Sequence, residues 1–481
     1  MAERMLKFVT APSQPPEKRE AAERREDFSE IYREFLLRKA EEQAARCSQC
    51  GVPFCQSHCP LQNNIPDWLR LTAEGRLQEA YDVSAATNAM PEVCGRICPQ
   101  DRLCEGNCVI EQSGHGTVTI GAVEKFLTET AWANGWVAPI RPPRERSESV
   151  GIIGAGPAGL AAAARLRARG YQVAIYDRYD RVGGLLIYGI PNFKLEKEVV
   201  ARRERHLRDS GVAFRLNCEI GVDLGFDDLR AQHDAVLIAT GVYRARDLGD
   251  VPGPTKHALP AMDFLTAANR VGLGDSVPAF DSGALNAKGK RVVVIGGGDT
   301  AMDCVRTAVR QDAKSVTCLY RRDRENMPGS LREVGHAEEE GVVFEWLAAP
   351  REMLGTARKL SGVGATRMRL GAPDAGGRRA PEPVPGGAFV APADMVILAL
   401  GFEPEDLPER FARSDLKTTR WGTLRTNVKT MQTSLPGVYA AGDIVRGASL
   451  VVWAIRDGVD AADAIHADLK ERAASSAIAA E

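Results

Sequence analysis

Residues 150–160 read VGIIGAGPAGL, an apolar run that leads into Gly154, Gly156 and Gly159. The next stretch, PAGLAAAARLRARG, predicts a helix, and YQVAIYD, which ends at Asp177, predicts a second strand. A strand, a glycine turn, a helix and a parallel strand open a doubly wound α/β domain that binds a dinucleotide. The first glycine permits the turn, the second admits a pyrophosphate, and the third lets the helix pack on the strand.

FAD is the favoured ligand of this first turn. Asp177 stands at the end of the second strand, where a carboxylate accepts hydrogen bonds from a ribose diol. A glycine pair follows in RVGGLLIYGIP, and a later strand ends in Gly442-Asp443, where an aspartate can bind a ribityl hydroxyl. The predicted FAD residues are Gly154, Gly156, Gly159, Asp177, Gly183, Gly184, Leu185, Thr240, Gly241, Gly442 and Asp443.

A second dinucleotide turn lies in RVVVIGGGDTAMD at 291–303, which fits the variant G-x-G-x-x-A. After the next strand, SVTCLY, arginines stand where an acid would bind a ribose of NADH. Arginine there suits a 2′-phosphate, so the sequence predicts NADPH, with a solvated strand end as the alternative. The predicted NADPH residues are Gly296, Gly298, Asp299, Thr300, Ala301, Arg321 and Arg322.

Eight of the eleven cysteines lie between Cys47 and Cys108, spaced C-x2-C-x4-C-x3-C-P and C-x3-C-P-x4-C-x3-C. The first group resembles a ferredoxin run, in which the last cysteine serves the other cluster. This predicts two 4Fe–4S clusters, with zinc and disulfides as weaker alternatives. The predicted ligands are Cys47, Cys50, Cys55 and Cys108 for the first cluster, and Cys59, Cys98 and Cys104, with Cys94 as a possible fourth, for the second.

The composition excludes several classes of protein. The 481 residues carry a net charge of −2, which gives no broad basic surface for nucleic acid or an anionic membrane. No apolar run approaches the roughly 20 residues that span a bilayer. The N-terminus lacks the apolar core of a secretory signal. We therefore expect a cytoplasmic protein whose cysteines are reduced and free to bind metal.

The chain divides into a helical part and an α/β part. An amphipathic helix is predicted across residues 15–46, further helices across 64–77, 78–87 and 121–132, a linker at 137–149, and hairpins or loops at 352–392. The predicted domains are 1–147, helical with two clusters; 148–285 and 403–481, the two parts of an FAD domain; and 286–402, an NADPH domain.

The order and spacing of these motifs resemble those of the small (beta) subunits of bacterial NADPH-dependent glutamate synthase. The matching stretches include CSQCGVPFCQSHCP, CGRICPQDRLCEGNC, GGLLIYGIP and AAGDI. The modules are also similar to parts of dihydropyrimidine dehydrogenase. The resemblance implies a helical iron–sulfur domain, followed by an FAD domain interrupted by an NADPH domain, as in disulfide-reductase-like flavoproteins. It also implies that Glu124 could replace Cys94 as a ligand of the second cluster.

The resemblance implies a function as well. A hydride passes from NADPH to FAD, and single electrons then pass through the clusters to a large (alpha) subunit that makes glutamate from glutamine and 2-oxoglutarate. A hetero-oligomer is therefore expected, without nucleic acid or membrane as a partner. Hydride transfer needs alignment, so no general acid or base is assigned. The alternatives are a free-standing NADPH:ferredoxin or sulfide-linked oxidoreductase, and a zinc-stabilised scaffold.

Overall fold

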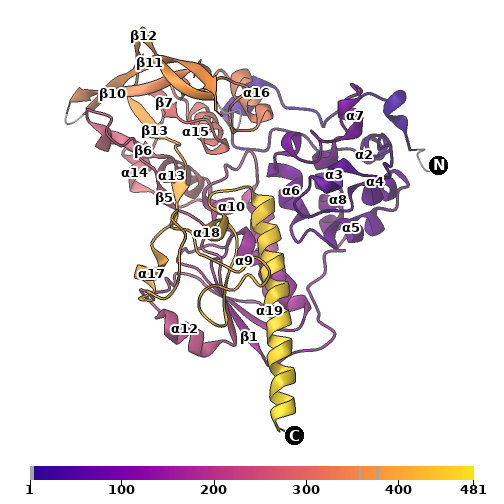
Figure 1. Cartoon of the computed structure of the whole chain (residues 1–481). Coiled ribbons are helices and arrows are strands. Elements are labelled where there is room, and N and C mark those ends of the chain that lie inside the picture. The colour runs from indigo at the N-terminus through magenta and orange to yellow at the C-terminus, as the bar shows by residue number, and fades with distance from the viewer. Residues whose placement is uncertain (1–4, 357–358, 375–378, 481) are drawn as a thin grey trace.

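Short helices make up the N-terminal part of the chain, at the upper right of Figure 1. The computed structural model describes residues 5–356, 359–374 and 379–480. The small core of this part is centred on the fully buried Trp68, Val123 and Leu127. Its elements are η1 (Lys7–Val9), α1 (Ala21–Glu26), α2 (Leu37–Ala44), α3 (Phe54–Ser57), α4 (Ile65–Ala73), α5 (Leu77–Ala85), α6 (Pro91–Ile97), η2 (Gln100–Arg102), α7 (Val109–Gln112) and α8 (Ile120–Ala133).

The single helix predicted across residues 15–46 is wrong, whereas the helices predicted near α4, α5 and α8 are confirmed. The chain forms α1 and α2, and the segment between them is mostly extended. The apolar residues of this segment contact other parts of the molecule. The Tyr32 hydroxyl, for example, lies 2.9 Å from Nε2 of His336 in α16 (Leu331–Glu339). Tertiary contacts therefore override the helical pattern.

Five parallel strands form the first sheet, in the order β15-β4-β1-β2-β3. The fully buried strand β4 lies at its centre with β1, as predicted for a doubly wound domain. The strands are β1 (Ser149–Ile153), β2 (Gln172–Tyr176), β3 (Ala213–Arg215), β4 (Ala235–Ile238) and β15 (Val438–Ala440). Their helices are α9 (Pro157–Ala168), α10 (Leu185–Tyr188), α11 (Lys197–Asp209) and α12 (Phe226–Gln232).

A second five-stranded parallel sheet has the order β6-β13-β7-β8-β9. The strand β6 belongs to this sheet but precedes residue 286, the predicted start of the NADPH domain. The exact domain boundaries stay a prediction. The elements are β6 (Ala258–Pro260), β7 (Arg291–Ile295), β8 (Ser315–Tyr320), β9 (Val343–Trp346), β13 (Met395–Leu398), η3 (Thr255–His257), α13 (Ala261–Gly272), α14 (Pro278–Asp281), α15 (Asp299–Arg310) and α16.

An antiparallel sheet, β10-β11-β12, caps the second domain at the top of Figure 1, so the hairpins predicted at 352–392 are confirmed. A small pair, β5 with β14, joins the two α/β domains. These strands are β10 (Ala348–Thr356), β11 (Lys359–Pro373), β12 (Arg379–Pro392), β5 (Arg244–Ala245) and β14 (Phe402–Glu403), and the last helices are α17 (Leu407–Arg410), α18 (Asp443–Arg446) and α19 (Val451–Ala480).

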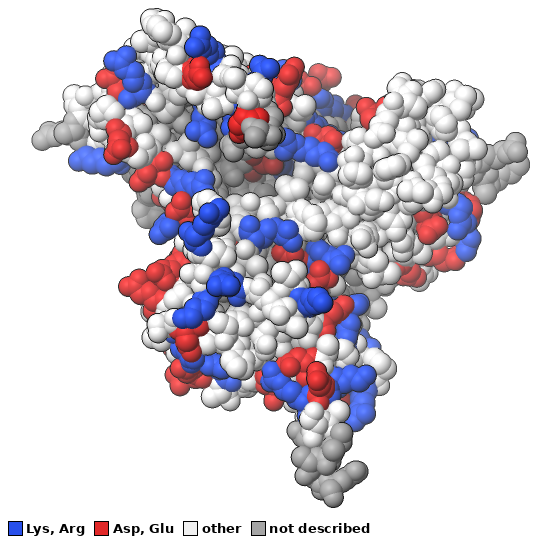
Figure 2. Space-filling view, viewed as in Figure 1, with Lys and Arg blue, Asp and Glu red and all other residues white. Residues whose placement is uncertain are grey.

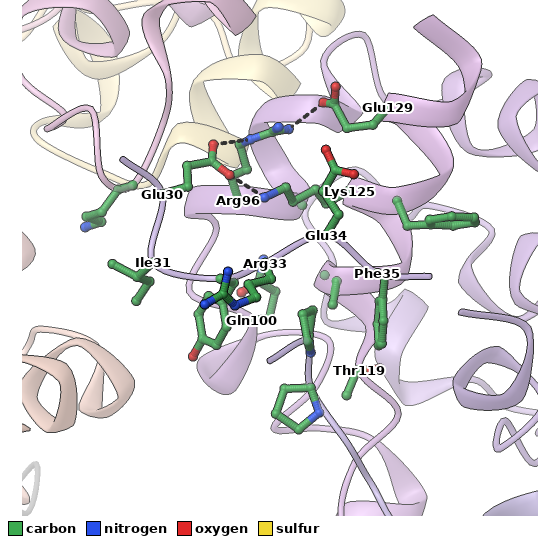
Figure 3. A pocket seen from close by; sticks show the side chains of 18 of the residues that line it. Glu30, Ile31, Arg33, Glu34, Phe35, Arg96, Gln100, Thr119, Lys125 and Glu129 are labelled. Carbon is green, nitrogen blue, oxygen red and sulfur yellow. Dashed lines mark hydrogen bonds and ion pairs between the residues drawn. The ribbon is translucent and has the colours of Figure 1, made fainter. Parts of the chain in front are cut away.

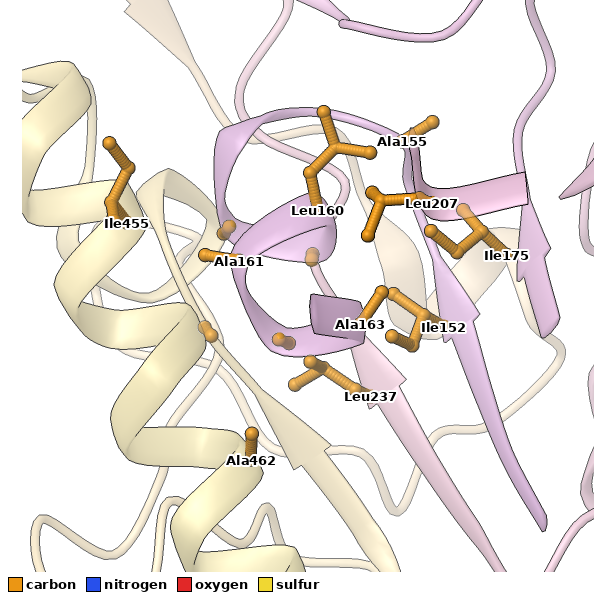
Figure 4. Close-up of a cluster of buried hydrophobic side chains, with 14 of the residues drawn as sticks. Ile152, Ala155, Leu160, Ala161, Ala163, Ile175, Leu207, Leu237, Ile455 and Ala462 are labelled. Atoms are coloured by element: carbon orange, nitrogen blue, oxygen red, sulfur yellow. The ribbon is translucent and has the colours of Figure 1, made fainter. Parts of the chain in front are cut away.

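The C-terminal helix α19 returns to the first α/β domain, as predicted, and packs along α9 (Figure 1). Figure 4 shows why the two helices approach closely: the side of α9 that faces α19 carries alanines such as Ala161, and α19 presents Ile455 and Ala462. All three side chains are fully buried. On its other side α9 covers the sheet through Ile152 of β1. The N-terminus of α9 is thereby fixed between the sheet and α19.

Candidate functional site

The two dinucleotide turns share one geometry. Gly154 has φ +110°, and a Cβ there would lie 2.4 Å from the carbonyl oxygen of Ala239, which follows β4. Gly296 has φ +151°, and its Cβ would lie 2.3 Å from the carbonyl oxygen of Ala399, which follows β13. Only glycine fits either position. The two turns are therefore structural repeats, although their sequences differ.

Open space lies beside the middle glycine of each turn. A Cβ on Gly156 or on Gly298 would meet no heavy atom within 4 Å, and each glycine is the N-cap residue of the following helix. The third positions differ: a Cβ on Gly159 would lie 2.0 Å from the Gly154 carbonyl oxygen, whereas Ala301 is accommodated in α15. The N-terminus of a helix of twelve residues, with unbonded N–H groups beside open space, fits a pyrophosphate.

Asp177, Gly154 and Thr240 line one cavity at the carboxyl end of the first sheet. The Asp177 carboxylate accepts hydrogen bonds from the backbone N–H groups of Ala155, at 2.6 Å, and Tyr179, at 2.9 Å. Burial raises the pKa of this carboxyl group, and the backbone donors offset part of the shift. The buried Thr240 hydroxyl has no hydrogen-bond partner within the described part of the chain. An unpaired hydroxyl in this cavity fits a polar ligand such as the ribose of FAD.

The second half of the predicted FAD site lies against the first. A Cβ on Gly184 would lie 3.1 Å from Cα of Gly156, so this loop needs a glycine there. Its neighbour Gly183 donates a backbone hydrogen bond to the turn, and Leu185 begins α10. In the C-terminal part of the chain, a Cβ on Gly442 would lie 3.0 Å from Cβ of Ala158. Asp443, whose pKa is raised by burial, and Gly241, at φ +71°, complete the set.

Near the second turn, Asp299 has a hydrogen-bond partner within the protein, whereas the arginines that follow β8 have free donors among the described residues. The Asp299 carboxylate accepts a hydrogen bond from the backbone N–H of Ser330 at 2.9 Å and so holds the neighbouring loop; Thr300 follows it in α15. Arg321 is exposed, and Nε of Arg322 is buried without a hydrogen-bond partner in the part of the chain that the structure describes. An unpartnered guanidinium N–H shortly after β8 fits a phosphate ligand.

The first predicted cysteine group comes together as expected. Cys47, Cys50, Cys55 and Cys108 line one small cavity between α3, α4 and α7. Burial, and then the neighbouring thiols, raise the pKa of Cys55 to about 12; burial likewise raises that of Cys47 to about 11. Such buried thiolates are unstable alone and are stabilised by a bound metal.

The second group surrounds Glu124. The electrostatic neighbours of Cys98 include Cys59 and Glu124, and those of Cys104 include Cys98 and Cys59. Burial raises the pKa of each of these thiols and raises that of Glu124 to about 8. Cys94 is buried in the same place, where burial also raises its pKa. The geometry therefore brings both candidates for the fourth ligand to this group.

Asn88 connects the two candidates. Its side-chain Nδ2 donates to the Glu124 carboxylate at 3.1 Å, and its Oδ1 accepts from the Cys94 thiol at 3.8 Å.

No three His, Cys, Asp or Glu side chains in the described ranges are arranged to hold a single metal ion. A 4Fe–4S cluster places each thiolate on a different iron and so needs a wider arrangement.

The two cysteine groups differ in the buried clusters that they contact. Cys94 belongs to the same buried cluster as Leu186 of α10, and Cys59 and Cys98 pack against that cluster. Cys47 and Cys108 belong to the core of the helical domain, as does Cys104 of the second group, and Cys59 also packs against this core. The second group therefore lies at the boundary between the helical core and the cluster that contains Leu186, whereas Cys47, Cys55 and Cys108 lie with the helical core.

Two lysines in the stretch KLEK were missed by the sequence analysis. The Lys194 ammonium lies 2.8 Å from the Asp303 carboxylate in α15, so it links the two α/β domains. The buried Lys197 ammonium donates hydrogen bonds to the backbone carbonyls of Leu186, at 3.0 Å, and Ile190. Nothing in the sequence signals either lysine directly, because their partners are backbone carbonyls or a residue far along the chain.

A cavity of about 540 Å³ lies where the segment 30–35 meets α6, α8 and α16 (Figure 3). Four of the charged side chains that line it form ion pairs with one another. Glu30 accepts from Nε of Arg96 at 2.6 Å and pairs with Lys125, and Arg96 also pairs with Glu129 at 2.8 Å. We assign this cavity no ligand, because these ion pairs already have their partners.

Comparisons with known proteins agree with this geometry. The family model described as dihydropyrimidine dehydrogenase domain II, 4Fe-4S cluster, matches residues 24–136, and that of pyridine nucleotide-disulphide oxidoreductase matches residues 148–458. A glutamate synthase (NADPH) small chain of Azospirillum brasilense is 63% identical over 480 residues, which cover 100% of this chain and 99% of the relative. The chain belongs to the family of glutamate synthase (NADPH) small chains.

A second glutamate synthase (NADPH) small chain, from Escherichia coli, is 45% identical over 472 residues, which cover 97% of this chain and 99% of the relative. Among solved structures, Mycobacterium tuberculosis FprA in complex with NADPH has a TM-score of 0.58 at 20% identity, over 69% of this chain and 86% of that one. The predicted fold class, a helical iron–sulfur domain followed by two nucleotide-binding domains of the disulfide-reductase type, is confirmed. Of the helices described, none is both long and apolar enough to cross a bilayer.

Proposed function

We propose that this chain is the NADPH-oxidising subunit of a glutamate synthase. It delivers electrons to a large (alpha) subunit that makes glutamate from glutamine and 2-oxoglutarate. The observation that carries the proposal is the presence, in one chain of this family, of two dinucleotide turns and two groups of buried thiols. Bound FAD supplies the conversion of a hydride into single electrons, and two bound 4Fe–4S clusters relay them.

The protein contributes binding and alignment. The first turn, with Asp177 and Asp443, holds FAD, and the second turn, with Arg321 and Arg322, holds NADPH and selects its 2′-phosphate. No side chain is assigned as a general acid or base. The cysteine groups would hold one cluster each. The second group, whose Cys94 shares a buried cluster with Leu186 of α10, would hold its cluster on the side of the predicted FAD loop.

The fourth ligand of the second cluster is either Cys94 or Glu124, and the two variants Cys94→Ser and Glu124→Ala distinguish them. Only loss of the true ligand should alter the electron paramagnetic resonance spectrum of that cluster and lower its iron content. The other variant should keep both.

Purification from the native host tests the function as a whole. We expect a cytoplasmic complex with a large glutaminase-containing chain, in which NADPH oxidation depends on glutamine and 2-oxoglutarate. Turnover with ferredoxin alone, without such a chain, would favour a free-standing NADPH:ferredoxin oxidoreductase instead.

A further inference from the structure

Charged side chains are distributed unevenly between the two cysteine-rich stretches of the chain. From Cys47 to Pro66 the sequence contains no Asp, Glu, Lys or Arg. Figure 2 shows that the helical domain, at the upper right, presents a face that is nearly free of red and blue. The stretch from Cys94 to Cys108 differs, because it carries Arg96, Asp101, Arg102 and Glu105. Within these two stretches, the charged residues thus lie around Cys98 and Cys104 of the second group.

Two acidic residues lie next to the thiols of the second group. Asp101 stands between Cys98 and Cys104 in the sequence, and Glu105 directly follows Cys104. Both carboxylates are electrostatic neighbours of Cys98, and Glu105 is also one of Cys104. The Glu105 side chain is buried, and its Oε1 accepts a hydrogen bond from the backbone N–H of Gly121 at 3.0 Å. Water therefore screens little of the charge that Glu105 places beside a cluster held by these thiols.

The cationic partner of Glu105 comes from the second α/β domain. Nη2 of Arg332, in the first turn of α16, donates to Oε2 of Glu105 at 2.5 Å. Nη1 of the same guanidinium donates to Oε1 of Gln100 at 3.2 Å. Arg332 and Glu105 are 227 positions apart in the sequence. The charge of Glu105 is therefore compensated from outside the helical domain.

The segment that precedes α16 is held from two sides. The Ser330 hydroxyl donates to the Asp101 carboxylate at 3.1 Å, and the backbone N–H of Ser330 bonds to Asp299, beside the second dinucleotide turn. Arg102 also donates to the backbone carbonyl oxygens of residues 327 and 328. These bonds anchor the start of α16 to the helical domain and to the second turn. They hold the guanidinium of the first turn of α16 against its partner.

The sign of the expected effect follows from electrostatics. Reduction of a 4Fe–4S cluster adds one electron and therefore one negative charge. A carboxylate without a partner beside the cluster opposes this charge and lowers the reduction potential, whereas a cation raises it. The Arg332 side chain is 38% exposed, so water screens part of its effect.

We propose that Arg332 raises the reduction potential of the second 4Fe–4S cluster by neutralising Glu105. The proposal rests on the proposed function, because that function supplies the cluster and the electrons that reduce it. Arg332 is a positioning residue in this role, since it acts through Glu105. The potential of a cluster in the helical domain then depends on a side chain of the domain predicted to bind NADPH.

The test is a redox titration of the anaerobically purified holoenzyme, followed by electron paramagnetic resonance. The signal of the second cluster is the one that the fourth-ligand variants alter. Arg332→Gln should lower its potential, with a change of about three- to tenfold in the equilibrium constant of one-electron reduction; tenfold corresponds to ~59 mV. Arg332→Lys keeps the charge and should keep the potential close to that of the wild type.

Two further variants separate charge from packing. Glu105→Gln keeps an acceptor for Gly121 but removes the negative charge, so it should raise the potential of the second cluster. Arg324→Gln is the matched control, because it removes the same charge from an arginine that pairs with Glu338 of its own domain at 2.8 Å. The control should titrate as the wild type does.

Two results would overturn the proposal and leave the proposed function standing. One is an unchanged potential of the second cluster in Arg332→Gln. The other is a shift of the same sign in Arg332→Gln and Glu105→Gln, which would mean an effect of packing. If Arg332→Gln loses the cluster, Glu105→Gln decides, since an unchanged or lowered potential there contradicts the proposal. A wild-type holoenzyme without iron would reject the proposed function, and this inference with it.

Discussion

Gly458 in α19 lies so close to α9 that a Cβ at this position would stand 2.2 Å from the carbonyl oxygen of Ala158. The helix α19 thus packs against the first turn of the helix that begins at the glycines predicted to bind FAD. The C-terminal segment therefore supports the first predicted dinucleotide site, because it fixes the helix terminus that would face the pyrophosphate.

Gly458→Val should separate α19 from α9 and weaken FAD binding. An overpacked contact of this kind costs about 1–3 kcal/mol. We expect a lower thermal midpoint and substoichiometric FAD in the purified protein, measured by absorbance. Gly335→Ala is the control, since Gly335 lies inside α16 with no heavy atom within 4 Å of a Cβ. Full FAD content in the valine variant would contradict the role of this contact.

Arg321→Ala combined with Arg322→Ala should impair NADPH much more than NADH. Loss of hydrogen bonds to a charged group costs about 1.5–3 kcal/mol, or roughly 10- to 100-fold in KM for NADPH. Arg324→Ala is the matched control, because that arginine lies in the loop that follows the same strand but pairs with Glu338 at 2.8 Å. Equal losses with both nucleotides would show that Arg321 and Arg322 do not contact the 2′-phosphate.

Sequence reasoning succeeded where the backbone geometry demands a particular residue. Glycine is required at Gly154 and Gly296, so both turns were predictable. It failed for the segment that contains Tyr32, because spacing alone cannot distinguish a helix face from an extended segment that packs on a remote domain. The ion pair of Lys194 with Asp303 was likewise invisible, since it joins residues more than a hundred positions apart.

Arg24→Ala should release the N-terminal segment from the NADPH domain. The buried Arg24 guanidinium bonds to Glu339 at 2.7 Å and Glu340 at 3.3 Å. Arg306 and Arg310 still pair with Glu340 in this variant, so the cost is that of hydrogen bonds to a charged group, about 1.5–3 kcal/mol. We expect faster proteolysis within residues 27–36, and mass spectrometry of the fragments measures it. The control Arg33→Ala removes a half-exposed side chain and should leave the cleavage rate unchanged.

Lys197→Met should lower the thermal midpoint, increasingly so at alkaline pH. Burial lowers the pKa of Lys197 to about 7, whereas the unfolded chain keeps its ordinary value of 10.5. The unfolded state therefore binds more protons above about pH 7, and the wild type gains stability as pH rises. Methionine cannot titrate and leaves the carbonyls of Leu186 and Ile190 without this donor.

The midpoints of wild type and Lys197→Met should consequently diverge between about pH 7 and pH 9. The exposed Lys288→Met is the control and should show the same pH dependence as the wild type. A constant difference between wild type and Lys197→Met across this range would show that Lys197 is not a buried titrating group.

The central claim is that the N-terminal thiols hold iron–sulfur clusters that receive electrons from NADPH through FAD. The most direct measurement is iron and acid-labile sulfide analysis of anaerobically purified protein, combined with absorbance spectra before and after NADPH is added. We predict iron and sulfide equivalent to two 4Fe–4S clusters per chain, and bleaching of the flavin and cluster bands by NADPH. A colourless, zinc-containing protein that NADPH does not bleach would contradict the account.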